Sequence, residues 1–215
     1  MRVISATTLV SISMALTACT GTNTADYRPA TMHEIRNEKV VDRPFARVWD
    51  EYVAALSKEF FVINNISKDS RIINISFESS QPGQYVDCGE TTRTVNHLAI
   101  GTRTINYKAA ESSQFVWAGT NNSLWNLDRR TRMIGRANIY LAPEGSKTLI
   151  RVNARYAFTV NTFATSINPP GRSEQAPTIT IDFTTQEPGT YTDRVGTARC
   201  SSRGELERKL LGLVN

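Results

Sequence analysis

The sequence predicts an α+β fold in which one long helix packs across a curved antiparallel sheet and a second amphipathic helix ends the chain. Two observations favour this class. Apolar residues recur at spacings of three and four between Phe45 and Leu56, as they do on one face of a helix. Most of the chain over residues 60–183 instead alternates apolar with polar residues or carries short β-branched runs, which is typical of strands. We therefore expect one α+β domain over residues 36–215.

The first helix and its neighbours have the clearest pattern. A helix of about 15 residues should follow a short strand at 39–41, with Asp42 as its N-cap and Pro44 near its first turn. A β-hairpin should come next, with strands at 60–63 and 71–77 around a turn at 68–70. The expected buried stripe of the helix consists of Phe45, Val48, Trp49, Tyr52, Val53 and Leu56.

The remainder of the domain should be mainly strands, separated by breaks rich in Asn, Ser, Gly and Pro at 119–123, 143–146 and 168–173. The expected strands are 94–100, 105–107, 114–117, 133–141, 148–160 and 178–183. At the C-terminus, Ser202 and Glu205 have the spacing of a capping box, which predicts a final helix. The apolar stripe of that helix consists of Leu206, Leu210, Leu213 and Val214.

The first residues have the features of a secretory signal. Met1 and Arg2 precede an uncharged run to Ala18 that is shorter than the roughly 20 residues of a membrane span. The motif Leu16-Thr17-Ala18-Cys19 resembles the lipobox of bacterial lipoproteins. That resemblance implies removal of residues 1–18, attachment of a lipid to Cys19, and a flexible tether over residues 19–35. An ordinary signal peptide or a buried strand with an incidental cysteine are the alternatives.

Export from the cytoplasm would determine whether the cysteines are oxidised and which membrane the chain is attached to. The chain has three cysteines, and if Cys19 carries lipid, then Cys88 and Cys200 are left in an oxidising compartment. We expect them to form a disulfide, the alternative being two separate buried thiols. Thr20 follows the lipobox where enteric inner-membrane lipoproteins have Asp, which favours the periplasmic side of the outer membrane.

The sequence contains no recognisable catalytic motif, so we expect no catalytic residue, no cofactor, no metal and no enzymatic activity. His33 and His97 are isolated, and an acidic pair of Asp87 with Glu205 would need the disulfide to bring them together. The aromatic residues Trp117, Trp125 and Tyr140 could line a groove but fit a core better, and the basic cluster Arg129, Arg130 and Arg132 fits a solvated turn. A net charge of +5, spread along the chain, does not favour a nucleic-acid partner.

Residues 44–73 resemble the opening of a helix-grip domain in the BamC family of outer-membrane assembly lipoproteins. The resemblance lies in Pro44-Phe45, Val48-Trp49, Phe60-Phe61-Val62 and the segment from Lys68 to Ile73. It implies a helix-grip fold and a role, with an envelope protein as partner, in outer-membrane assembly or in an envelope complex. The alternative function is a module that holds a lipid or another apolar molecule in a cavity between helix and sheet.

Overall fold

The computed structural model describes residues 21–193 and 196–215 and is mostly β, with 59% strand and 11% helix. The expected α+β class, with one long helix packed across the sheet as in helix-grip proteins, is therefore wrong. The helices are short, and several strands come from polar, threonine-rich segments whose solvated residues conceal the apolar alternation. The unexpected strands are β1 (Thr22–Arg28), β5 (Val86–Asp87), β11 (Ser173–Gln175), β13 (Gly189–Asp193) and β14 (Gly196–Ser202).

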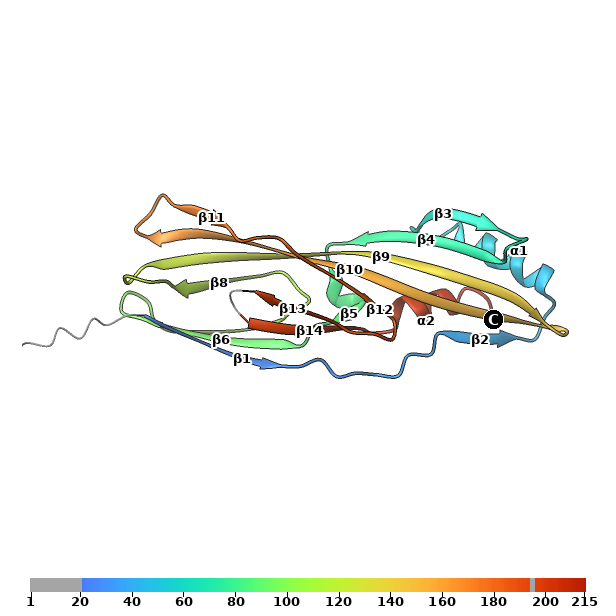
Figure 1. Ribbon diagram of the computed structural model, residues 1–215, viewed down its shortest axis with the longest axis horizontal. Coiled ribbons are helices and arrows are strands. Elements are labelled where there is room, and N and C mark those ends of the chain that lie inside the picture. The colour runs from blue at the N-terminus through green and yellow to red at the C-terminus, as the bar shows by residue number, and fades with distance from the viewer. Residues whose placement is uncertain (1–20, 194–195) are drawn as a thin grey trace, which may run out of the picture.

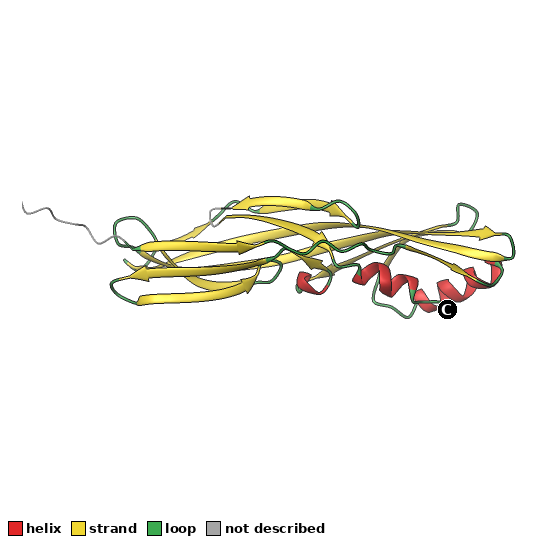
Figure 2. Ribbon diagram, turned by 90° about the horizontal axis from the view of Figure 1, so that it is seen from below, coloured by secondary structure: helices red, strands yellow, loops and turns green. Residues whose placement is uncertain are grey.

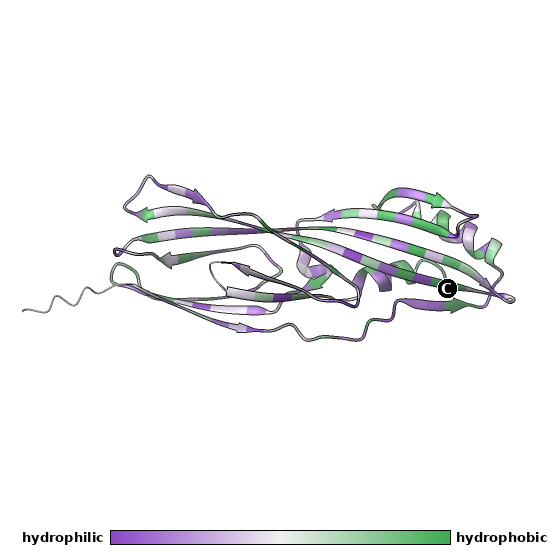
Figure 3. Ribbon diagram, in the orientation of Figure 1, coloured by the Kyte–Doolittle hydropathy of each residue, from purple (hydrophilic) through white to green (hydrophobic). Residues whose placement is uncertain are grey.

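A long hairpin forms the frame of the molecule (Figure 1). Strand β9 (Leu124–Glu144) pairs with β10 (Lys147–Asn168) along their whole length. At about 3.3 Å per residue, 21 residues span about 70 Å. Figure 3 shows hydrophobic and hydrophilic residues alternating along both strands. The alternation places one face of the hairpin in the core and leaves the other in contact with water.

Other strands flank this hairpin to form an eight-stranded sheet. On the β9 side, β4 (Ile72–Ser79) and then β3 (Val62–Ser67) pair at one end, and β8 (Ser113–Ala118) pairs at the other. On the β10 side lie β2 (Glu38–Val41), β12 (Ile179–Thr184) and β11. The expected hairpin around residues 68–70 is confirmed, as are strands matching all six of the expected later strands.

Two small sheets complete the body. The first has the order β1-β6-β7, with β6 at Glu90–His97 and β7 at Gly101–Lys108. The expectation of a flexible tether over residues 19–35 is thus wrong for β1, whose Asn23 and Tyr27 are half-buried while its other side chains are exposed. The second has the order β13-β14-β5 and follows the short 3₁₀ helix η1 (Pro82–Gln84).

The helices α1 (Phe45–Leu56) and α2 (Glu205–Leu211) lie together near one end of the sheet (Figure 2). The expected α1 stripe is confirmed, because Val48, Trp49, Tyr52 and Leu56 are each at most 4% exposed. The N-cap of α1, however, is Pro44 and not Asp42, and it makes no side-chain cap bond. The two helices are joined by the Tyr52 hydroxyl, which donates a hydrogen bond of 3.0 Å to the Leu210 carbonyl.

The C-terminal helix is present where expected, but the capping box is wrong. Gly204 is the N-cap, with φ of 72°, because the chain must turn sharply out of β14 into α2. Ser202 belongs to β14, and its Oγ accepts a hydrogen bond from the Gly204 N–H at 3.0 Å. Glu205 pairs with Arg208 instead of reaching back to the cap. The apolar stripe of α2 is confirmed, since Leu206 and Leu210 are fully buried.

Close packing of β4 on β9 depends on a glycine. The Phe77 ring lies over Gly135, where an added Cβ would come within 2.2 Å of the ring. The same ring packs against Tyr85 at 4.8 Å between centroids and against Phe61 at 5.7 Å. Gly135 thus lets an aromatic cluster cover the frame at this end.

We predict that Trp49→Ala lowers the free energy of unfolding by about 3 to 5 kcal/mol, because it leaves a cavity beneath α1. Denaturant unfolding followed by circular dichroism measures this loss. The exposed Val40 in β2 provides the control, and Val40→Ala should change stability by less than about 0.5 kcal/mol. An unchanged midpoint for Trp49→Ala would contradict the packing described for α1.

Candidate functional site

The Cys88–Cys200 disulfide joins the C-terminal segment to the rest of the fold. The predicted bond is present, and the two Cα atoms lie 3.9 Å apart. Next to it, Ser201 pairs with Asp87, so β14 and β5 continue the connection. The Tyr27 hydroxyl of β1 donates to the Cys88 carbonyl at 3.1 Å and accepts from the Arg199 N–H at 2.9 Å. This corner therefore gathers residues from the beginning, middle and end of the described chain.

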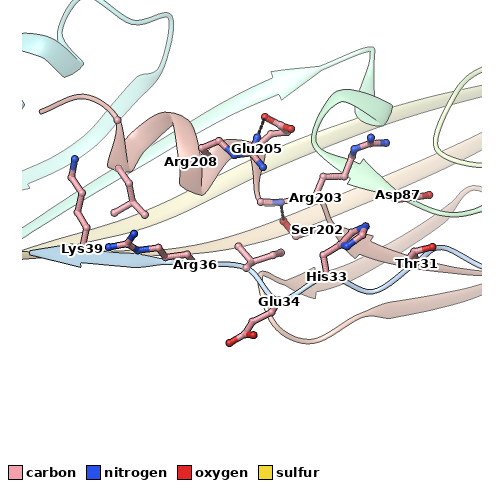
Figure 4. Close-up of a pocket in the computed structure, with 14 residues that line it drawn as sticks. Thr31, His33, Glu34, Arg36, Lys39, Asp87, Ser202, Arg203, Glu205 and Arg208 are labelled. Carbon is pink, nitrogen blue, oxygen red and sulfur yellow. Dashed lines mark hydrogen bonds and ion pairs between the residues drawn. The ribbon is translucent and has the colours of Figure 1, made fainter. Parts of the chain in front are cut away.

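A polar cleft of about 720 Å³ opens beside this corner, between residues 31–39 and the start of α2 (Figure 4). Five of its lining side chains can carry positive charge: His33, Arg36, Lys39, Arg203 and Arg208. Figure 4 shows Asp87 and Glu205 on either side of Arg203, so the structure brings both acidic residues to one cleft.

Asp87 and Glu205 already have structural partners in this cleft. Glu205 pairs with Arg208, and Asp87 accepts a hydrogen bond from the Gly89 N–H at 2.8 Å. Lys39 donates to the Val214 carbonyl, and burial, together with Arg36 and Arg43, lowers its pKa. Of these contacts, only the one between Lys39 and Val214 joins distant parts of the chain.

A buried polar network that the sequence did not reveal fixes α2 on β10. Glu207 is fully buried and accepts hydrogen bonds from Thr185 Oγ1 at 2.6 Å and from the Tyr156 hydroxyl at 3.3 Å. Ser202 Oγ donates to the same Tyr156 oxygen at 3.3 Å. Burial, followed by the nearby Glu207 charge, raises the pKa of Tyr156. Each of these groups serves a neighbour inside the core, which indicates a structural role.

The basic cluster at residues 129–132 is divided by the strand. It lies within β9 and not in the expected turn, so Arg129 points into the core while Arg130 and Arg132 are exposed. Arg129 donates to the carbonyls of Glu111 and Ala109, at 2.8 and 2.6 Å, and to the Tyr191 hydroxyl at 2.7 Å. The alternation of a strand places Arg129 on the same face as the buried Leu127 and Met133, and Arg130 and Arg132 on the opposite face. Reading this segment as a strand would therefore have indicated the division.

The remaining candidates are placed as follows. His97 is 2% exposed, its Nδ1 accepts from the Ala99 N–H at 3.1 Å, and its Nε2 contacts the Asn122 carbonyl at 3.2 Å, as expected for a satisfied core histidine. Trp117 and Trp125 face each other across β8 and β9 and are only half-buried, so the expectation of a core position is wrong for them. Tyr140 is half-buried in β9. Cys19 lies outside the described residues.

Four of the nine large hydrophobic residues that are exposed in the described chain lie in or just before β3, at the outer edge of the sheet. In the described chain β3 pairs with β4 alone, so its other edge has no strand beside it. Four exposed residues form what we call the β3 edge patch: Phe60 at 103% exposed, Val62 at 62%, Ile63 at 37% and Ile66 at 39%. Glu59 and Lys68 flank these residues in sequence and form ion pairs with Lys209 and Asp50.

A bulge gives the patch its shape. Ile63 pairs with Ile75 and Ile66 with Ile73, with the register shift between residues 63 and 65. Without the extra residue, a spacing of three would place the two isoleucines on opposite faces. With it, both lie on the helix-facing side at the rim of the core. The unpaired edge thus offers backbone groups and apolar side chains together.

We predict that the buried tyrosines make the fold sensitive to alkali. Burial raises the pKa of Tyr52 and Tyr156 and raises that of Tyr191 to about 12. Their contribution to stability is complete below about pH 10, where an unfolded tyrosine is still protonated, and is lost as pH rises towards the folded pKa. Tyrosinate absorbance and unfolding should therefore rise together between about pH 10 and 12.

Tyr52→Phe should make the decline in stability with pH less steep, since one fewer buried hydroxyl resists ionisation. Ionisation of all seven tyrosines at about pH 11 in a chain that remains folded would contradict this account.

The described residues contain neither a membrane-spanning helix nor a cluster of metal-binding side chains. No helix in this part of the chain is long and apolar enough to cross a membrane. No three His, Cys, Asp or Glu side chains gather within residues 21–193 and 196–215 as metal ligands would. Comparison with family models, curated proteins and solved structures likewise finds no match to the chain, so its geometry is the basis for any functional assignment.

Proposed function

We propose that this chain is a non-catalytic lipoprotein of the bacterial envelope that acts by binding another envelope protein through the β3 edge patch. The observation that carries the proposal is the unpaired β3 edge with its four exposed apolar residues. An open strand edge accepts an extended segment of a partner through backbone hydrogen bonds, while exposed side chains supply specificity.

The elongated shape supports this function. The described chain begins at one end of the molecule, whereas α1 and β3 lie at the opposite end of the β9–β10 hairpin (Figure 1). A lipid on Cys19 would hold the first end at the membrane, on the periplasmic side of the outer membrane. The β3 edge patch would then stand on the order of 70 Å away along the hairpin, if the molecule stands upright.

The alternative of an apolar molecule held beneath α1 has less support. The volume beneath that helix is filled by Val48, Trp49, Tyr52 and Leu56 together with the buried leucines of α2. A helix packed in this way stabilises the platform that carries the β3 edge patch and favours a contact role.

The anchor has a direct test. We predict that the mature N-terminus is residue 19 and that it carries a lipid mass, which Cys19→Ser abolishes together with membrane fractionation. Mass spectrometry of the protein isolated from envelopes checks both. An unmodified N-terminus, or cleavage at another residue, would refute lipidation at Cys19.

The contact surface has a separate test. We predict that Ile66→Lys removes the chain from a larger complex in mildly solubilised envelopes, because a lysine on an edge strand opposes strand addition. Native gel electrophoresis of the full chain measures the size of the complex. Since Ile66 is 39% exposed, the substitution should leave the fold intact, and an unchanged unfolding midpoint verifies this.

Leu98→Lys is the matched control, because Leu98 is 76% exposed at the turn between β6 and β7, far from the patch. It should leave the complex unchanged. Migration of the wild-type chain alone, or equal complex formation by Ile66→Lys, would overturn the proposal.

A further inference from the structure

A second cleft, unrelated to the β3 edge patch, lies at the opposite end of the molecule. It has a volume of about 390 Å³ and opens between the β1-β6-β7 sheet and β8. This volume falls in the range of about 300 to 1,000 Å³ that is usual for small-molecule sites. Most of the surface exposed inside it is apolar and comes from Val95, Ile100, Ile105, Phe115, Val116 and Trp117. Its polar lining residues are Asn23, Thr24, Arg93, Thr94, Arg103, Thr104 and Gln114.

Strand pairing and side-chain hydrogen bonds fix the residues that line the cleft. Register places Asn23, Val95 and Arg103 in one cross-strand row, and Arg93 with Ile105 in the next, so these side chains share the face of the small sheet. The Asn23 amide makes two hydrogen bonds to the backbone of Ala118, of 2.7 and 2.9 Å, which join β1 to the end of β8.

Two arginines, Arg93 and Arg103, also line the cleft. Arg93 is only 6% exposed, and its guanidinium lies 5.1 Å from the centre of the Phe115 ring and 6.0 Å from that of Trp117. Its Nε donates to the Tyr107 hydroxyl at 2.9 Å. Arg103 is exposed at the mouth, and no carboxylate belongs to the described lining. The cleft thus combines apolar wall residues with one buried arginine, Arg93, and one exposed arginine at its mouth, Arg103.

We propose that this cleft binds an anionic amphiphile with a single acyl chain, such as a fatty acid. The acyl chain would lie against the apolar wall residues, and the carboxylate would pair with Arg103 at the mouth. The cleft is at the end where the described chain begins, so it would face the membrane if the proposed anchor is correct. The ligand assignment itself depends only on the chemistry of the walls.

Fluorescence quenching by dibromostearate tests the proposal on the full chain carrying Cys19→Ser, which cannot hold a lipid at that position. Bromine quenches a nearby indole, and Trp117 lies in the wall. Added Trp125→Phe leaves Trp117 and the buried Trp49. We expect saturable quenching of this chain, and its loss when Trp117→Phe is also introduced.

Two further measurements test whether the carboxylate of the ligand pairs with Arg103. Arg103→Gln should weaken dibromostearate binding about tenfold, because it removes a charge-assisted hydrogen bond. The methyl ester of the same acid should bind as weakly to the assay chain in which Arg103 is retained. Arg172→Gln is the control, since Arg172 lies over Trp125 in a neighbouring cleft that Trp117 also lines, and it should change nothing.

Absence of saturable quenching would overturn the proposal. So would equal binding of acid and ester with no effect of Arg103→Gln, or weakening by Arg172→Gln in place of Arg103→Gln. The isolated chain in this assay has neither anchor nor protein partner, so its result is independent of the test of the β3 edge patch.

Discussion

The pairing of β9 with β10 is the interaction on which the rest of the structure depends. The other strands of the large sheet pair with one or the other of these two strands, except β3, which is joined to β9 through β4. Both helices pack near one end of the buried face of the hairpin. The hairpin needs a tight connection, and its two-residue turn is provided by Gly145 with a φ of 61° next to Ser146. A single long hairpin thus separates the two ends of the molecule, which is the geometric basis for assigning them different roles.

The C-terminal segment is attached to this frame by two different means. The Cys88–Cys200 disulfide closes a loop of 112 residues, which in the chain-entropy view stabilises the fold by roughly 4 to 5 kcal/mol. The buried contacts of Glu207 with Thr185 and Tyr156 then fix α2 on β10. Loss of either attachment should loosen the platform beneath α1 while the hairpin persists, because the α1 residue Tyr52 bonds to the α2 residue Leu210.

The sequence predicted those features that depend on local apolar pattern. The α1 stripe, the hairpin after it and the strands matching the six later expectations were identified because their apolar residues recur at helix or strand spacing and most of these elements bury one face. Cysteine parity identified the disulfide. It failed where burial depends on distant partners. Thr22–Arg28 is polar yet becomes β1 because β6 lies beside it. The apolar stripe expected for the last helix did not include Glu207, which is buried because Tyr156 and Thr185 donate hydrogen bonds to it in the core. The cleft with Arg93 and Arg103 combines four strands, a juxtaposition that no local pattern contains.

We propose that the exposed β3 edge, held at one end of the long β9–β10 hairpin, is the surface that a partner strand covers. Hydrogen–deuterium exchange of the full chain tests this most directly, by comparing β3 (Val62–Ser67) with its neighbour β4 (Ile72–Ser79) in purified protein and in envelopes. We expect β3 amides to exchange faster than β4 amides in the purified chain, and to become protected in envelopes. Equal protection of the two strands in the purified chain, or no added protection of β3 in envelopes, would contradict the account.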